Sequence, residues 1–303
     1  MNLIQKAESI KKKISSKISF NENLSKFSWF NLGGAAKVVF RPENLKELSF
    51  FLKEIKDFNT IKVLGAGSNT LIRDGGFDGV IIKFGKSFSH ISLFDSNTII
   101  AGASVLDKNI SNFALANALS GFEFLSCIPG TIGGAVRMNS GCYGQNISKI
   151  LVSVQAMDLN GNIKIIKSSD IKFYYRGSDL EENLIFISAT FKGKKIEKSA
   201  ISKKMDDFII KKKNDQPSKI KTCGSTFKNP LNNKAWKLIK DSGCEKMKVG
   251  DAQFSDKHCN FLINKGKAKS KDFESLIQQV KSKVLNKTGI NLELEIKVIG
   301  ENL

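Results

Sequence analysis

The chain has 303 residues, 41% of them hydrophobic, and a formal net charge of +19. It is long enough for two or three domains with a buried core, and no apolar run approaches the roughly 18 residues of a membrane-spanning helix. The first 13 residues mix lysines with an acid and lack the apolar centre of a signal peptide, so we expect no membrane insertion. The five cysteines form no Cys-x-x-Cys pair, which favours reduced thiols in a cytoplasmic protein.

The positive charge comes from lysine, with 44 Lys against 4 Arg. The lysines are scattered and not interleaved with aromatic residues, so we expect no nucleic-acid partner; a positive field would also attract a small anionic substrate. Three of the four arginines, Arg73, Arg137 and Arg176, lie in unusual glycine-rich or tyrosine-rich segments. A guanidinium group offers a planar fork to carboxylate or phosphate, so each is a candidate for such a contact.

The apolar periodicity predicts a mixed α and β chain without an internal repeat. Helices are expected at 1–13, 44–57, 105–119, 199–213 and 273–284, the last with Ser270 as its N-cap. Strands are expected at 61–64, 80–84, 98–103, 151–158, 162–167 and 185–191, with a hairpin turn at Asn160-Gly161. The final segment alternates, which places Leu292, Leu294, Ile296 and Val298 on one face and Asn291, Glu293, Glu295 and Lys297 on the other.

A first glycine-rich segment, residues 64–76, follows the strand at 61–64. Its Gly65-x-Gly67-x-x-Thr70 pattern resembles the dinucleotide fingerprint of a Rossmann fold. That fingerprint opens a helix, whereas here Gly75 and Gly76 would break a helix at once and another strand follows. We therefore predict a phosphate-binding loop between two strands and reject a Rossmann site.

A second glycine-rich segment, residues 128–144, holds five glycines and one proline. Glycine destabilises both helices and strands, so this segment is expected to be neither a plain helix nor a plain strand. Glycine is favoured where backbone must approach a ligand closely and point its amides at it. Two such loops in one chain predict a large anionic ligand, such as a dinucleotide, held at two places.

Two later segments are rich in polar side chains. Ser225 follows a glycine in the segment 222–230 but is not in a Gly-x-Ser-x-Gly elbow, and the chain has only two histidines. From the residues alone, a turn serine that caps the next helix is the favoured interpretation, and a proton-donating serine is the alternative. The segment 250–264 offers donors suited to a sugar or a phosphate: Gln253, Ser255, Lys257, His258 and Asn260. No spacing fits a metal site, and Glu293 and Glu295 are by default solvent-facing.

Six motifs in register, from about residue 27 to residue 300, resemble the UDP-N-acetylenolpyruvoylglucosamine reductase (MurB) family. They lie at 65–69, 73–79, 128–134, 175–178, 224–230 and 235–239. The resemblance implies an α+β fold, with a two-subdomain flavin-binding part of the vanillyl-alcohol-oxidase (PCMH) type and a C-terminal α+β substrate domain. The expected parts are residues 1–85, 86–198 and 199–303.

The resemblance also implies a cofactor and a reaction. Non-covalent FAD would take hydride from NADPH and pass it to the enolpyruvyl group of a UDP-sugar in peptidoglycan precursor synthesis. The expected cofactor-binding residues are Gly65, Gly67, Ser68, Asn69, Ile128, Pro129, Gly130, Thr131, Gly133 and Gly134. Ser225 would protonate the substrate α-carbon, while Arg176 and Glu295 would bind and polarise its carboxyl group.

The chain departs from the family pattern in two respects. Cys127 stands where the family usually has glycine, and Cys142 where it commonly has alanine. The chain also resembles the branch of the family that lacks a tyrosine-bearing loop over the substrate. The candidates for holding the substrate are therefore Tyr175, Asn229, Gln253 and His258.

Two alternatives remain: another flavin oxidase or dehydrogenase of the same fold, and a non-catalytic basic binding protein. Purified protein that is yellow, is bleached by NADPH and is re-oxidised by the enolpyruvyl nucleotide would exclude both. We expect a cytoplasmic monomer that binds no metal.

Overall fold

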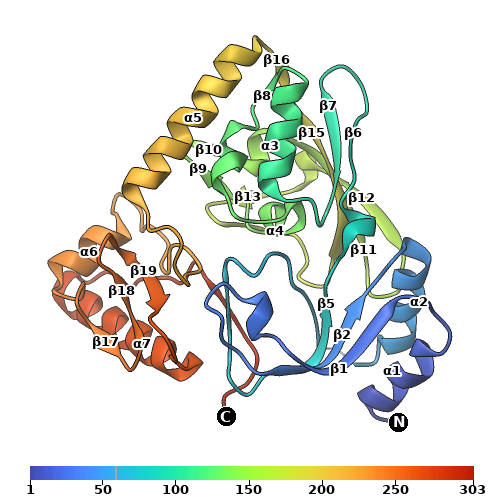
Figure 1. Ribbon diagram of the computed structural model, residues 1–303, viewed down its shortest axis with the longest axis horizontal. Helices are drawn as coiled ribbons and strands as arrows, with labels where there is room; N and C mark the ends of the chain where they lie inside the picture. The colour runs from blue at the N-terminus through green and yellow to red at the C-terminus, as the bar shows by residue number, and fades with distance from the viewer. Residues whose placement is uncertain (59) are drawn as a thin grey trace. The chain divides into compact units, whose positions relative to one another are not determined.

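The computed structural model describes residues 1–58 and 60–303. The chain forms two compact units, and each is described by itself. The first unit comprises residues 1–20, 37–66 and 79–212, and the second comprises residues 21–36, 67–78 and 213–303. Figure 1 shows the helix α5 (Lys198–Asp215), along which the chain passes from the first unit to the second.

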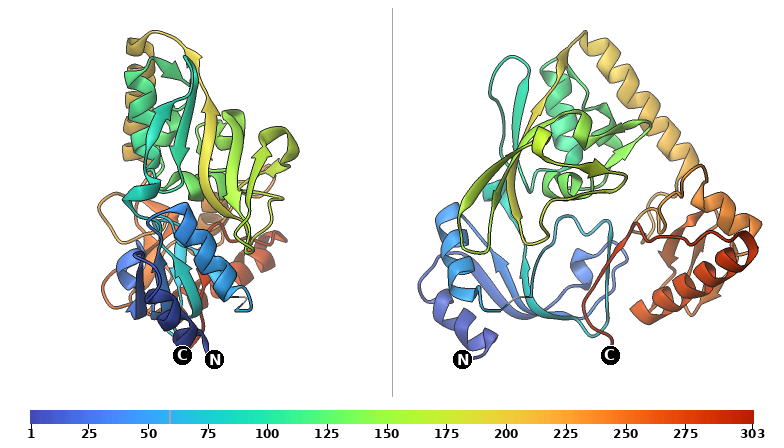
Figure 2. Two further views of the ribbon diagram at one scale, coloured as in Figure 1. Left: turned by 90° about the vertical axis from the view of Figure 1, so that its right-hand side faces the viewer. Right: turned by 180° about the vertical axis from the view of Figure 1, so that it is seen from behind.

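The N-terminal part of the first unit pairs two helices with a sheet of order β1-β2-β5-β3. The strands are β1 (Lys17–Asn23), β2 (Ala35–Arg41), β3 (Ile61–Val63) and β5 (Phe77–Ile82), and the helices are α1 (Leu3–Lys11) and α2 (Leu45–Ile55). Asn44 caps α2 by accepting from the Glu47 amide at 2.8 Å. Phe51 of α2 stacks on Phe40 of β2 with centroids 3.8 Å apart. Helices α1 and α2 pack side by side (Figures 1 and 2).

The larger part of the first unit is an antiparallel five-stranded sheet of order β12-β11-β15-β7-β6. Its strands are β6 (Ile91–Leu93), β7 (Thr98–Gly102), β11 (Leu151–Met157), β12 (Ile163–Lys167) and β15 (Ile185–Lys192). The predicted turn joins β11 to β12, with Gly161 at φ +74°. The helix α4 (Ile132–Arg137) packs on β7 and β15, and its Val136 lies in the same core as Ile110 of α3 (Asp107–Ala116).

The second unit is built on α7 (Ser270–Thr288), which packs on the sheet β17-β18-β19. Its other elements are α6 (Ala235–Asp241), β17 (Lys248–Val249), β18 (Ala252–Ser255), β19 (His258–Asn264), and the parallel pair β4 (Thr70–Ile72) and β20 (Lys297–Ile299). Phe30 packs on Phe273 with centroids 4.6 Å apart, so the segment before β2 joins the core of this unit. Gly289 ends α7 at φ +70°, a conformation that favours glycine.

Short elements complete the chain. The two-residue strands are β8 (Leu119–Ser120), β9 (Gly141–Cys142), β10 (Gln145–Asn146), β13 (Phe173–Tyr174), β14 (Gly177–Ser178) and β16 (Lys194–Lys195). The 3-10 turns are η1 (Ser25–Phe27), η2 (Lys86–Phe88), η3 (Glu123–Cys127), η4 (Ile147–Lys149) and η5 (Ser168–Asp170).

Three expectations about local structure need correction. The first glycine-rich segment is not a loop throughout, because residues 70–72 form the strand β4, which pairs with β20. The alternating segment 291–298 is a strand only at 297–299, because residues 293–295 pair with residues 226–228 through isolated hydrogen bonds. The N-cap of α7 is Lys269, because Ser270 bonds the Asp74 carboxylate instead.

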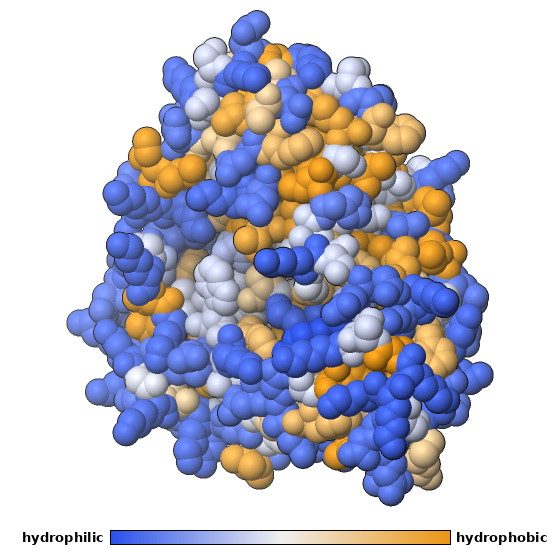
Figure 3. All heavy atoms as spheres, turned by 45° about the vertical axis from the view of Figure 1, so that its right-hand side comes forward, coloured by the Kyte–Doolittle hydropathy of each residue, from blue (hydrophilic) through white to orange (hydrophobic). Residues whose placement is uncertain are grey.

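In the part of the chain that the structure describes, no helix has the length and apolar character needed to cross a membrane. Figure 3 shows one face of the molecule, on which hydrophilic side chains predominate and hydrophobic ones form scattered groups.

Candidate active site

The two glycine-rich loops meet in the first unit. A Cβ atom built on Gly65 would lie 2.7 Å from Oγ1 of Thr131, so the first loop touches the second where the first has no side chain. Lys83, which directly follows β5, donates its ammonium to the carbonyl of Gly65. Burial and the nearby charge of Arg41 lower the pKa of Lys83. A half-buried cation thus holds the backbone of the first loop, and no local pattern in the sequence points to it.

The second loop rests on the start of α3. The amides of Ile132 and Gly133 donate to the carbonyls of Val105 and Ala103 at 2.9 Å each. A side chain on Gly130 would collide with the carboxyl group of Asp107. Asp107 is fully buried, and neither of its carboxyl oxygens has a hydrogen-bond partner among the described residues. Burial raises the pKa of Asp107 well above its usual value, which favours the neutral carboxyl group.

The later residues of the first loop belong to the second unit. Gly67 has φ +69°, and a side chain there would collide with the carbonyl of Phe27. Asn69 is fixed from both sides: its side chain donates to the Glu295 carbonyl at 3.0 Å, and its own carbonyl accepts from the Lys297 amide at 2.9 Å. The backbone of this loop is therefore tied to the C-terminal segment of the chain.

Ser225 and Glu295 lie on adjoining segments of the second unit. The Glu295 amide donates to the carbonyl of Thr226, next to Ser225, at 2.8 Å, and Phe227 is bridged to Leu294. The segment 225–227 is held from its other side by Asn260, whose side-chain amide both accepts from and donates to the Phe227 backbone at 3.0 and 2.9 Å. A half-buried serine and a half-buried glutamate thus lie on segments that are hydrogen-bonded to each other.

The expectation that Ser225 caps the next helix is wrong. The next helix, α6, begins at Ala235 with Lys234 as its N-cap. Asn229 fixes its start, because the Asn229 side chain accepts from the Ala235 amide at 3.0 Å. The serine is therefore available for a role other than capping.

The two C-terminal glutamates differ. Glu293 is exposed and forms an ion pair with Lys228 at 3.2 Å, as the default interpretation expects. Glu295 is half-buried, so the default interpretation fails for this residue.

His258 lies in the same unit. Its ring accepts a hydrogen bond from the Asn260 amide at 3.2 Å and lies against Phe261. Burial lowers the pKa of His258, which favours the neutral imidazole.

Gln253 lies in β18, opposite Ile263 in the ladder with β19. Its side-chain amide donates to the Phe254 carbonyl at 3.5 Å. Gln253 and His258 therefore lie in the same sheet of the second unit as Asn260.

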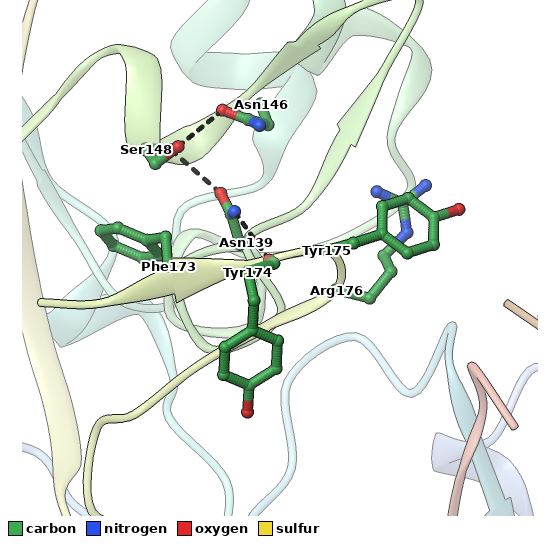
Figure 4. Close-up of a pocket in the computed structure, with 7 residues that line it drawn as sticks. All are labelled: Asn139, Asn146, Ser148, Phe173, Tyr174, Tyr175 and Arg176. Carbon is green, nitrogen blue, oxygen red and sulfur yellow. Dashed lines mark hydrogen bonds between the residues drawn. The ribbon is translucent and has the colours of Figure 1, made fainter. Parts of the chain in front are cut away.

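Arg176 stands at the tip of the β13–β14 hairpin in the first unit. It has φ +62°, a conformation that strains a residue other than glycine. The Tyr175 ring lies over its guanidinium group, with 4.8 Å between the guanidinium carbon and the ring centroid. Figure 4 shows Asn139 behind the hairpin, where it donates to the Tyr174 carbonyl at 3.1 Å and accepts from the Ser148 amide at 3.0 Å. A pocket of about 310 Å³ lies here, and it is lined by Asn139, Asn146, Ser148, Phe173, Tyr174, Tyr175 and Arg176.

The other two singled-out arginines have protein partners. Arg73 forms a bidentate pair with Glu274, with contacts of 2.7 to 3.2 Å, and also donates to the Gly300 carbonyl. Arg137 donates to the carbonyls of Leu180, Glu181 and Leu184 at 2.7 to 3.1 Å. These contacts hold loops in place, so we assign neither arginine to a ligand.

Within residues 1–58 and 60–303, no group of three or more His, Cys, Asp or Glu side chains could hold a metal ion.

Comparison with known proteins places this arrangement in a class and then in a family. Residues 36–167 match the family model of an FAD binding domain, and residues 215–299 match that of the C-terminal domain of UDP-N-acetylenolpyruvoylglucosamine reductase. The class is thus a two-part flavoprotein, and the fold class expected from the resemblance is confirmed.

Named relatives agree. The chain is 51% identical over 98% of its length to the UDP-N-acetylenolpyruvoylglucosamine reductase of Pelagibacter ubique (99% of that protein covered), and 44% identical over 92% to that of Rickettsia massiliae (95% covered). The structure of the enzyme from Thermus caldophilus matches 94% of this chain and 99% of its own, with a TM-score of 0.80 at 29% identity. The chain belongs to the UDP-N-acetylenolpyruvoylglucosamine reductase family.

Proposed function

We propose that this protein is the NADPH-dependent flavoenzyme that reduces UDP-N-acetylglucosamine enolpyruvate to UDP-N-acetylmuramate in peptidoglycan precursor synthesis. The observation that carries the proposal is the pairing of the Ser225 segment with the Glu295 segment. A proton donor beside an acid suits a reaction that adds hydride to one carbon and a proton to its neighbour. A flavoprotein that only removes hydride from its substrate has no need of that donor.

The residues of the two loops fit FAD. A side chain on Gly65 would collide with Thr131, and a side chain on Gly130 would collide with Asp107. Because both positions are glycine, the loops can approach a ligand with their backbone. We assign the contacts with FAD to residues 65, 67–69, 128–131, 133 and 134. When bound, FAD supplies the hydride that it takes from NADPH, and the chain supplies binding, orientation and the proton.

We assign the protonation of the substrate α-carbon to Ser225. Arg176, with its planar guanidinium, binds the substrate carboxyl group and stabilises the negative charge that develops there. Glu295 helps to orient and polarise the same group. Tyr175, Asn229, Gln253 and His258 are the proposed contacts with the rest of the nucleotide sugar. The division of the chain at residues 85 and 198 stays a prediction.

We also propose that the protein is a cytoplasmic monomer and that nucleic acid is not its partner. The scattered distribution of 44 lysines with only four arginines supports the second point. Sedimentation of the purified protein tests the monomer, cell fractionation tests the location, and a gel shift at physiological salt tests nucleic-acid binding.

An anaerobic flavin titration tests the reaction. The purified protein should be yellow, NADPH should bleach it, and the enolpyruvyl nucleotide should restore the colour at a rate that matches turnover. Denaturation should release free FAD into the supernatant. Reduced flavin that oxygen alone re-oxidises would indicate an oxidase of the same fold, and colourless protein that cannot be reconstituted with FAD would refute the proposal.

A further inference from the structure

Two thiols that the proposed reaction does not use face each other beside the second glycine-rich loop. Cys127 ends η3 and directly precedes the loop, and Cys142 lies in β9, which packs on η3. Each thiol lies close enough to the other to shift its pKa. Cys142 also donates to the Phe124 carbonyl at 3.4 Å, and the Ser126 hydroxyl lies 3.7 Å from the Cys127 sulfur.

A lysine from α5 accompanies the pair. Lys212 is half-buried and donates to the Cys127 carbonyl at 2.6 Å. One turn earlier, Phe208 stacks on Tyr143, the neighbour of Cys142, with centroids 5.0 Å apart, so α5 is anchored over this corner. The charge of Arg176 also acts on Cys142. The thiols therefore lie in a positive environment, which favours the thiolate that reacts with oxidants.

The two thiols are unequal. The nearby Cys142 thiol, with help from Ser126 and Lys212, lowers the pKa of the Cys127 thiol despite its burial. The nearby Cys127 thiol, together with burial, raises the pKa of the Cys142 thiol. Cys142 is half-buried and Cys127 is 7% exposed, so the pair lies at the border of the core. This combination of a nucleophilic thiol and a neighbouring thiol is typical of a dithiol that can be oxidised.

The remaining cysteines have surroundings that suppress reactivity. Burial raises the pKa of Cys223 to about 12, and burial also raises the pKa values of Cys244 and Cys259. All five cysteines are free. Cys244 and Cys259 therefore serve as internal controls in the same chain.

We propose that Cys127 and Cys142 are a modification site: hydrogen peroxide converts them to a reversible disulfide that displaces the loop 128–134. The Cys127 thiolate attacks the peroxide, so that an S–O bond forms, the O–O bond breaks and hydroxide leaves as water after taking up a proton. The Cys142 thiol then attacks the Cys127 sulfur, so that the S–S bond forms, the S–O bond breaks and a second water leaves with the Cys142 proton. The two thiols lose two electrons and the peroxide gains them; an external dithiol reverses the change.

The position of the pair links its oxidation to the loop. A disulfide holds its sulfurs about 2.05 Å apart, closer than any hydrogen bond between thiols, so Cys127 or Cys142 must shift. Cys127 is joined by one peptide bond to Ile128, the first residue of the loop. The new ring closes around the whole of 128–141, including α4. This consequence rests on the proposed function, in which the loop binds FAD, and we expect oxidation to raise the FAD dissociation constant by roughly tenfold.

Peptide mapping tests the disulfide independently of FAD. The protein is treated with hydrogen peroxide at neutral pH, remaining thiols are alkylated, and the chain is digested with trypsin. Cleavage at Lys108, Arg137 and Lys149 puts Cys127 and Cys142 in separate peptides, 109–137 and 138–149. We expect these peptides to be linked to each other, to separate after treatment with dithiothreitol, and to link before Cys244 or Cys259 is modified. Absence of that link, or oxidation of all five cysteines at equal rates, would overturn the proposal.

Two single variants test the order of attack. In C142A, peroxide should leave a sulfenic acid on Cys127 that dimedone traps, whereas C127A should give no such adduct on Cys142. The matched control C244S should form the linked peptides as fast as the original chain. An adduct on Cys142 in C127A, with none on Cys127 in C142A, would overturn the assigned roles.

FAD affinity tests the coupling to the loop. Apoprotein in its reduced and oxidised forms is titrated with FAD by flavin fluorescence, with C142A as the form that cannot make the disulfide. We expect weaker binding only for the oxidised original chain. A disulfide that forms without any change in affinity would refute the coupling. A protein that binds FAD in neither state would refute the proposed function, and the linked peptides would still decide whether the thiol pair reacts.

Discussion

Replacing Gly65 with alanine tests whether the contact between the two glycine-rich loops matters for FAD. The new Cβ would lie 2.7 Å from Oγ1 of Thr131, and an ordinary contact begins near 3.4 Å, so the loops must separate by about 0.7 Å (3.4 − 2.7). Crowding of this size in a packed region costs about 1–3 kcal/mol. If the loops of the protein without FAD move apart to relieve the crowding, the free energy of crowding weakens FAD binding, because both loops must then close on one ligand. The FAD dissociation constant should then rise roughly fivefold to a hundredfold.

The chain offers a matched control and a rescue. Gly134 faces the same Thr131 oxygen, but a Cβ there would lie at 3.7 Å, an ordinary contact. Gly134→Ala therefore adds a methyl group at a residue assigned to FAD without pressing the two loops apart, so Thr131→Ala should not rescue any loss of FAD affinity that it causes. Thr131→Ala removes the oxygen that Gly65→Ala would crowd, so the double variant should bind FAD as well as Thr131→Ala alone.

The assay is a fluorescence titration of apoprotein with FAD, with thermal unfolding of each apoprotein measured in parallel. The unfolding temperature shows how much of the crowding is already present without the cofactor. An FAD affinity and an unfolding temperature of Gly65→Ala that both equal those of the original chain would refute the inference that the two loops are pressed together. Additive effects of Gly65→Ala and Thr131→Ala would show that the crowding does not involve Thr131.

Three further predictions concern single groups. Ser225→Ala should leave reduction of the flavin by NADPH nearly intact. It should slow re-oxidation of the flavin by the enolpyruvyl nucleotide by about 10²–10⁴-fold, and Ser225→Cys should slow this step less. Stopped-flow traces that place the defect in the NADPH step would contradict the role assigned to Ser225. The raised pKa of Asp107 means that the folded protein keeps a proton that the unfolded chain releases, so this group's contribution to stability falls as pH rises from about 4 towards the raised value. Asp107→Asn should flatten that decline in urea unfolding, and a variant that instead loses stability relative to the original as pH rises would contradict this sign. Glu274→Gln should cost about 1 kcal/mol of stability by weakening its part-buried pair with Arg73, yet leave FAD affinity unchanged; a large loss of FAD affinity would implicate Arg73 in ligand binding.

The sequence predicts elements well wherever a local pattern decides the conformation. The helix α2 has its apolar stripe within one segment, and this stripe is present as expected. The first glycine-rich segment contains no helix, as predicted, because the glycines that exclude a helix lie within it, but its strand β4 (Thr70–Ile72) was not predicted. Periodicity does not report the short helix α4, in which Gly133 is required by the close approach of Ala103, 30 residues earlier in the sequence.

Within the candidate site, motif residues could be named in advance but their neighbours could not. Asp107 looks in the sequence like an ordinary acid in the first turn of a helix, and only its burial beneath Gly130 makes it unusual. Cys127 and Cys142 are 15 positions apart, and nothing in their spacing predicts that their thiols meet. Such features depend on long-range packing, which a single sequence does not encode in any local pattern.

The C-terminal acids show how such packing changes the chemistry of a residue. Simple alternation treats Glu293 and Glu295 alike, as two charges on one solvent-facing side of a strand. In place of a continuous strand ladder, this segment has separate backbone hydrogen bonds. The Lys228 amide donates to the Glu293 carbonyl, and the Glu295 amide donates to the Thr226 carbonyl. Glu293 is consequently exposed and paired with a lysine, whereas Glu295 is half-buried next to the Ser225 turn. The segments that carry Ser225 and Glu295, 70 positions apart in the sequence, are thereby joined by backbone hydrogen bonds, a link that the alternating pattern alone does not predict.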